Sequence, residues 1–149
     1  MNKTNKRIKI NKKYYNHLSQ KDKKKQLAMI EKSKKMYKQG KYFSRKKLDY
    51  PIKVSPYVIR AQKLYGTKII PSKELSLKTG CSMNALKQIV KKGEGAYYSS
   101  GSRPSQTAHS WAYARLASTI SGGKASKVDF HILKTCNKSK KAYKLAIKP

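Results

Sequence analysis

A glycine- and serine-rich stretch, KKGEGAYYSSGSRPS over residues 91–105, comes closest to a chemical site in this sequence. Its glycines free the backbone, and hydrogen-bond donors stand at its end: Ser99, Ser100, Ser102 and Arg103. A loop of this composition can wrap an anion. We expect the next helix to begin near Gln106, capped by Ser105 or Thr107, which would place its positive N-terminal end beside the same loop. The stretch therefore predicts an anion or partner site.

A second interpretation of this stretch stays open, because serine and arginine in a glycine-rich turn often cap neighbouring helices and bind their carbonyl groups. The stretch does not follow the P-loop pattern, in which four residues separate a glycine from Gly-Lys-Ser/Thr, and it does not open a βαβ unit. Nucleotide hydrolysis is therefore not supported.

Residues for catalysis or metal binding are few and scattered. The three histidines stand far apart, and the 6 carboxylates offer no close pair for acid–base chemistry. Cys81 and Cys136 lack CxxC spacing, so we interpret both as reduced, buried thiols of an intracellular protein. We expect no enzymatic activity, no small-molecule substrate, no cofactor and no metal.

Positive charge dominates the composition, with 37 Lys+Arg against 6 Asp+Glu and a formal net charge of +31 on 149 residues. A field of this size indicates an acidic partner. Lysine supplies 32 of the 37 charges, and its ammonium group contacts phosphates more readily than it reads bases. The candidate nucleic-acid- or anion-binding residues are Lys3, Lys6, Arg7, Lys12, Lys13, Lys23, Lys24, Lys25, Lys34, Lys35, Arg45, Lys46, Lys47, Lys87, Lys91, Ser99, Ser100, Ser102 and Arg103.

The elements that would position these residues predict a mainly α protein with four parts. Residues 1–50 form a long basic arm with one helix over 20–38, in which Ser19 is the N-cap and Gly40 follows the C-terminus. Its thin apolar stripe needs a docking surface. Residues 51–71 form a connector with a short helix near 58–65, residues 72–136 a small helical domain, and residues 137–149 a basic tail.

Within the helical domain, residues 72–92 show the outline of a helix-turn-helix around Gly80. The predicted inner seam consists of Leu75, Leu77, Leu86, Ile89 and Val90, and the predicted outer face of Met83, Asn84, Lys87 and Lys91. This outline fits both a DNA-reading motif and an ordinary helical hairpin. A helix ending at Gly122-Gly123 and another over 124–133, with Val128, Ile132 and Leu133 inward, complete the domain.

Several motifs resemble an uncharacterised domain of small basic proteins from large double-stranded DNA viruses. They are GEGAYYSSGSRPSQT at 93–107, SWAYARLAS at 110–118, GGKASKVD at 122–129, KQGKYFSRKK at 38–47 and KTGCS at 78–82. The resemblance implies a viral protein, made in a host cell and packaged in the virion as a capsid-lining or genome-associated component. It attaches no catalytic residue to this sequence.

These observations together predict a non-enzymatic virion structural protein, a minor capsid or capsid-lining component that binds capsid shell proteins and/or double-stranded viral DNA through its polybasic surface. The alternative is a DNA-binding regulatory protein that uses the helix-turn-helix. We expect the protein in the virion, and in the host cytoplasm or nucleus during assembly. No run of 18 apolar residues occurs, so we expect neither a membrane span nor a secretory signal.

Overall fold

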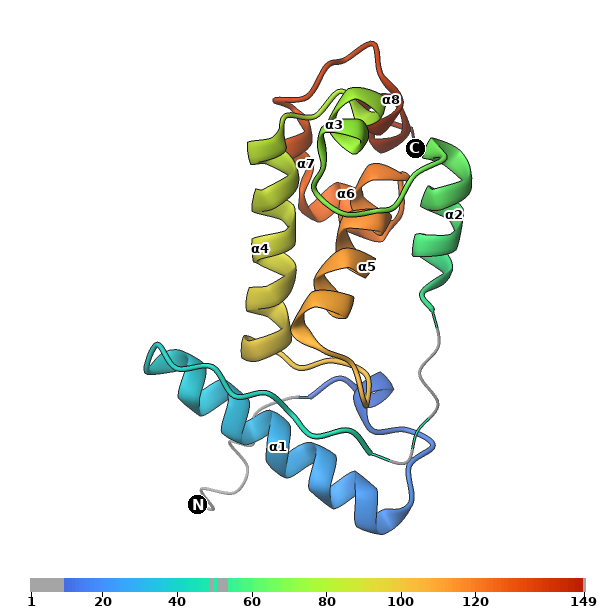
Figure 1. Cartoon of the computed structure of the whole chain (residues 1–149). Helices are drawn as coiled ribbons and strands as arrows, with labels where there is room; N and C mark the ends of the chain where they lie inside the picture. Colours follow the sequence, from blue (N-terminus) through green and yellow to red (C-terminus); the bar gives the residue numbers. More distant parts are fainter. Residues whose placement is uncertain (1–9, 49, 51–53, 149) are drawn as a thin grey trace. The chain divides into compact units, whose positions relative to one another are not determined.

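The computed structural model of the chain describes residues 10–48, 50 and 54–148 (Figure 1). In this part of the chain the regular structure consists of helices: a short 3₁₀ helix, Lys12–Tyr14, and the α-helices α1 to α8. The predicted mainly α fold class is confirmed. No helix among the described residues is long and apolar enough to cross a membrane.

The chain divides into two compact units that each combine distant segments. The first unit consists of Met1–Ile52 and Ala96–Thr107, and the second of Lys53–Gly95 and Ala108–Pro149. This division differs from the four consecutive parts expected from composition. The predicted basic arm shares the first unit with residues 96–107 of the predicted helical domain. The rest of that domain falls in the second unit, with residues 53–71 of the predicted connector and with the predicted tail.

Helix α1, Gln20–Lys38, has the bounds that the sequence predicts. The Asp22 N–H donates to Ser19 Oγ at 3.2 Å, which satisfies one free donor of the first turn. Gly40 adopts φ +75°, a left-handed conformation that glycine tolerates well. The N-cap and the glycine stop signal are therefore both confirmed.

Helix α1 packs against Ala96–Thr107, the later segment of the chain that belongs to the first unit. The Gln26 side-chain amide donates to Tyr14 O at 3.0 Å and to Ser102 O at 3.2 Å. The Ser33 hydroxyl donates to Tyr98 O at 2.9 Å. Ile30 is fully buried between these polar contacts. Hydrogen bonds from the α1 side chains to remote carbonyls thus supplement a thin apolar stripe.

The second unit is built around α5, Ala108–Ile120, whose Leu116, Ala117 and Ile120 are fully buried. Helices α2, Pro56–Tyr65, and α4, Met83–Ser99, both labelled in Figure 1, contribute further residues to the same apolar core. Short helices close it: α3 Lys73–Thr79, α6 Lys124–Val128, α7 Phe130–Leu133 and α8 Lys141–Ala146.

Helix α4 is longer than predicted and removes most of the expected loop. The helix predicted to end at Lys92 continues through Gly93 and Gly95 to Ser99, so the prediction of a loop is wrong for residues 93–99. A Cβ built on Gly93 would lie 2.7 Å from the Cα of Ala112, closer than real contacts allow. Gly93 therefore permits close approach of α4 and α5, a packing role that is indistinguishable from loop freedom in the sequence.

The predicted helix over 124–133 is interrupted at Asp129, which separates α6 from α7. The Asp129 carboxylate is fully buried and accepts hydrogen bonds from the guanidinium of Arg115 at 2.7 and 3.0 Å and from Thr119 Oγ1 at 2.8 Å. Ile132 and Leu133 are buried as predicted, whereas Val128 is 63% exposed and its predicted inward position is wrong.

Leu77 is another incorrect core assignment. Leu75, Leu86 and Ile89 are fully buried and Val90 packs against the core, as predicted, but Leu77 is 72% exposed. Residues two positions apart on a helix point about 200° apart, so Leu75 and Leu77 cannot share the inner face of α3.

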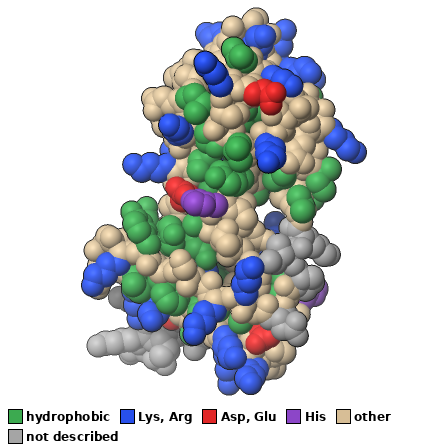
Figure 2. Space-filling model, viewed as in Figure 1, with side chains coloured by type: hydrophobic (Ala, Val, Ile, Leu, Met, Phe, Trp, Pro, Cys, Tyr) green, Lys and Arg blue, Asp and Glu red, His purple; other side chains and the backbone are tan. Residues whose placement is uncertain are grey.

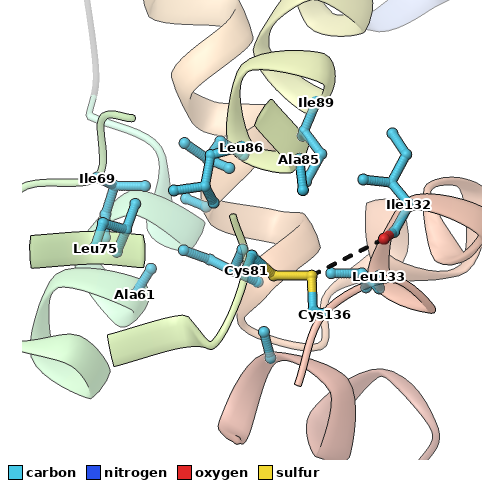
Figure 3. Packing of buried hydrophobic residues seen from close by; sticks show 14 of the residues in the cluster. Ala61, Ile69, Leu75, Cys81, Ala85, Leu86, Ile89, Ile132, Leu133 and Cys136 are labelled. Carbon is cyan, nitrogen blue, oxygen red and sulfur yellow. Dashed lines mark hydrogen bonds between the residues drawn. A yellow bond between two sulfur atoms is a disulfide. The ribbon is translucent and has the colours of Figure 1, made fainter. Parts of the chain in front are cut away.

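Cys81 and Cys136 form a disulfide within the core of the second unit (Figure 3). Their Cα atoms lie 4.3 Å apart although 55 positions separate them in the sequence. The predicted burial of both residues is confirmed, at 1% and 5% exposure. The prediction of reduced thiols is wrong, because the fold brings together two cysteines whose sequence spacing carries no pairing signal.

Candidate anion-binding surface

Most predicted basic site residues lie at the surface, in both units. Lys3, Lys6 and Arg7 lie outside the described residues. Nine lysines are exposed, and Lys23 and Lys34 are half-buried. The exposed set is Lys12, Lys13, Lys24, Lys25, Lys35, Lys46, Lys47, Lys87 and Lys91. On the face shown in Figure 2, Lys and Arg side chains are spread over the surface of each unit, with few acidic side chains among them.

None of these lysines forms an ion pair with an acidic side chain in the described part of the chain. Its two ion pairs join His109 to Glu94 at 3.1 Å and Arg115 to Asp129 at 2.7 Å. Neither pair includes a candidate lysine. The positive charge of the candidate lysines is therefore available to an external anion.

Helix α1 concentrates this charge on one side. Its buried residues, Gln26, Ile30 and Ser33, define the inner face. At 3.6 residues per turn, a group of exposed lysines falls on the opposite face of the same helix. These lysines are Lys21, Lys24, Lys25 and Lys35; the ammonium group of Lys32 instead lies over the ring of Phe43, 4.6 Å from its centroid. The ammonium groups on this face can contact a row of phosphates along a helix that is about 28 Å long at 1.5 Å per residue.

Arg45 has a different role from the one predicted, because its side chain is buried inside the first unit at 9% exposure. Its Nη1 donates to Ser33 Oγ at 3.1 Å and to Tyr97 O at 2.9 Å, and its Nη2 donates to Ser102 Oγ at 2.8 Å. The guanidinium cannot leave these acceptors for a phosphate without breaking the unit. Arg45 is therefore removed from the anion-binding set.

Burial affects the ionisation of Arg45. Desolvation lowers the pKa of its guanidinium, and the nearby Tyr97, Tyr14 and Tyr98 act in the opposite direction. Neutral hydrogen-bond acceptors and the ring of Tyr97, instead of a carboxylate, stabilise the buried charge.

The serine and arginine residues predicted as an anion loop lie in different environments. Ser102 is buried, accepts from Arg45 and donates to Arg103 O at 3.0 Å. Ser99 lies in the last turn of α4, with its Oγ 3.5 Å from that of Ser100. Arg103 and Ser100 remain exposed. The structure thus supports the interpretation of Ser102 as a residue that caps and ties neighbouring segments.

The next helix begins directly after Thr107, one of its two predicted caps, whereas Ser105, the other, has a different role. Helix α5 begins at Ala108, two residues after the predicted start. Ser105 binds Leu48 through two hydrogen bonds, accepting from Leu48 N at 3.0 Å and donating to Leu48 O at 3.1 Å. Its side chain fastens residue 48 to the returning segment within the first unit.

The sequence of this chain matches the model of one protein family, described as a family of unknown function (DUF5824), over residues 11–141. The chain belongs to the DUF5824 family. Comparison with curated proteins and comparison with solved structures each found no match. The matched range extends from before α1 to the first residue of α8, so the DUF5824 domain includes residues of both units.

The helix-turn-helix outline of this DUF5824 domain is present as α3, a turn and α4. Gly80 adopts φ +79° at the end of α3, and Ser82 Oγ accepts from Ala85 N at 3.0 Å at the start of α4. Asn84, Lys87 and Lys91 are exposed on α4, as expected for the outer face.

The sequence did not predict one cluster of charge in the second unit. Lys78, Lys140, Lys141 and Lys144 line a common pocket in the second unit. Lys140, Lys141 and Lys144 lie in the run KSKKAYK over 138–144, which the sequence analysis interpreted only as a basic tail. Nothing in the sequence places Lys78 beside that run.

Proposed function

We propose that this protein binds double-stranded DNA through phosphate contacts and acts as a structural, non-enzymatic component. The observation that carries the proposal is the set of exposed lysines without carboxylate partners in the described part of the chain, in particular those opposite the buried face of α1. Duplex DNA presents a dense row of negative charges, about one per 1.7 Å of helix axis.

The residue types favour contact with the backbone over reading of sequence. Lysine ammonium groups approach phosphates as point charges, whereas bidentate contacts to guanine depend on arginine. Of the few arginines, Arg45 and Arg115 are engaged inside their own units. The proposed binding is therefore independent of DNA sequence.

The resemblance to small basic proteins of large double-stranded DNA viruses extends the proposal. The DNA is then the viral genome, and the protein is a minor capsid or capsid-lining component that also contacts shell proteins. It resides in the virion and passes through the host cytoplasm or nucleus during assembly. Mass spectrometry of disrupted, purified virions tests this part, and absence of the protein from the particles would contradict it.

The salt dependence of DNA binding tests the phosphate-contact proposal. Changing Lys24, Lys25 and Lys35 to glutamine removes three exposed charges from α1. We expect the slope of log K against log [salt] to become shallower by up to about 0.9 per lost contact. The matched control changes Lys68, Lys124 and Lys134 of the second unit, also exposed, and should alter the slope much less. Equal changes in both variants would refute a dedicated α1 surface.

A second candidate function is sequence-specific regulation through α3 and α4, favoured by the capped α4 with exposed Asn84, Lys87 and Lys91. Footprinting on random-sequence DNA separates the two functions. A protected motif that disappears in Asn84→Ala would support the regulator, and uniform protection would support the structural protein.

A further inference from the structure

A lysine-lined pocket in the second unit is the feature with the clearest ligand chemistry beyond the proposed DNA surface. Its volume is about 520 Å³, within the range of about 300–1,000 Å³ typical of small-molecule sites. The lining residues are Leu64, Tyr65, Lys78, Ser139, Lys140, Lys141 and Lys144.

The charge of the pocket is uncompensated by its own lining, which contains four lysines and no acidic residue. Within the described residues, none of these lysines forms an ion pair. Like charges around one hollow repel each other, and a bound anion relieves that repulsion. The electrostatics of the pocket thus favour a ligand with several negative charges.

A rigid junction holds the two sides of the pocket together. Lys78 lies three residues before Cys81, and the other three lysines follow Cys136, so the disulfide joins the two segments (Figure 3). The Asn137 N–H donates to Gly80 O at 2.8 Å. A Cβ on Gly80 would lie 2.6 Å from Cγ of Lys140, which shows how closely the segments pack.

The apolar part of the lining is also fixed. The Tyr65 hydroxyl donates to Ile120 O at 2.5 Å, and the residue is 5% exposed. Burial raises the pKa of Tyr65, so its hydroxyl stays neutral and adds no negative charge to the pocket. Leu64 packs against the same core.

We propose that this pocket binds a small ligand with a chain of phosphate groups, such as a triphosphate. Ammonium groups form strong, charge-assisted hydrogen bonds to phosphate oxygens. Several lysines match the several charges of a phosphate chain better than the single charge of a carboxylate. The site lies apart in sequence from the α1 lysines and does not depend on DNA binding.

Calorimetric titration with inorganic triphosphate at fixed ionic strength tests the site. The variant Lys140→Gln/Lys144→Gln should bind at least about tenfold more weakly, since one charge-assisted hydrogen bond contributes about 1.5 kcal/mol or more. The control Lys124→Gln/Lys134→Gln removes the same charge from exposed positions outside the pocket. It should bind like the unaltered protein, and helical circular dichroism should be unchanged in both variants.

Three results would overturn the proposal: no binding of triphosphate by the unaltered protein, an equal loss of affinity in the pocket and control variants, or an equal loss of duplex DNA and triphosphate affinity in the pocket variant. The last result would make the pocket part of a DNA surface. A parallel titration with ATP identifies the source of the phosphate chain. Equal affinities indicate recognition of phosphates alone, and tighter ATP binding indicates contacts to the nucleoside as well.

Discussion

The guanidinium of Arg45 stacks over the ring of Tyr97, with 3.8 Å between its Cζ atom and the ring centroid, and donates to the carbonyl oxygen of the same residue. The two residues are 52 positions apart in the sequence. This contact fastens the segment after α1 to the segment that returns at Ala96, so the first unit depends on it.

Replacing Arg45 should destabilise the first unit. In Arg45→Met, the acceptors Ser33 Oγ, Tyr97 O and Ser102 Oγ lose their shared donor. We expect a loss of about 3 kcal/mol in the free energy of unfolding, measured by urea denaturation. The control Arg103→Ala, at an exposed arginine, should cost less than about 0.5 kcal/mol. A larger cost for Arg103 than for Arg45 would contradict this assignment.

Reduction of the Cys81–Cys136 disulfide should destabilise the second unit. The closed loop has a sequence separation of 55, for which the chain-entropy model predicts about 4 kcal/mol. Thermal unfolding with and without dithiothreitol measures this difference. Alkylation of the denatured, unreduced protein provides the independent check: labelling of both cysteines would show that the bond is absent.

The fully buried carboxylate of Asp129 should be more important for stability than the half-buried one of Glu94. In Asp129→Ala, Arg115 and the buried Thr119 lose their common acceptor, which should cost about 3 kcal/mol or more in the free energy of unfolding. Glu94→Gln breaks a surface pair with His109, a residue whose side chain is 71% exposed, and should cost less than about 1 kcal/mol. Chemical denaturation of both variants compares them, and similar losses would refute the difference.

Gly93→Ala should destabilise the protein although alanine favours helices by about 1 kcal/mol over glycine. The added Cβ would lie 2.7 Å from the Ala112 Cα, and backbone cannot yield as a side chain can. We expect a net loss of about 1–3 kcal/mol in thermal or urea unfolding. Equal or greater stability of the variant would show that α4 and α5 are not in close contact at this position.

The bounds of α1 and α3 could be predicted from the sequence, because nearby residues mark the start and the end of each helix. Ser19 and Gly40 bracket α1, and Ser72 and Gly80 bracket α3, because a cap satisfies nearby backbone groups and needs no distant partner. The same locality explains the incorrect prediction of a loop over 93–99. Glycine has the same signature in a loop as at a close helix contact, and only the position of Ala112 distinguishes the two.

The sequence by itself determined the mainly α class and the excess of positive charge, since both follow from residue types and short-range periodicity. Only the tertiary structure decided which charged and reactive groups are available. Arg45 is enclosed by Ser33, Tyr97 and Ser102, and Cys81 is joined to Cys136. Lys78 shares a pocket with Lys140, Lys141 and Lys144. These relationships join residues tens of positions apart, and a local pattern carries no information about contacts that form only when remote segments pack together.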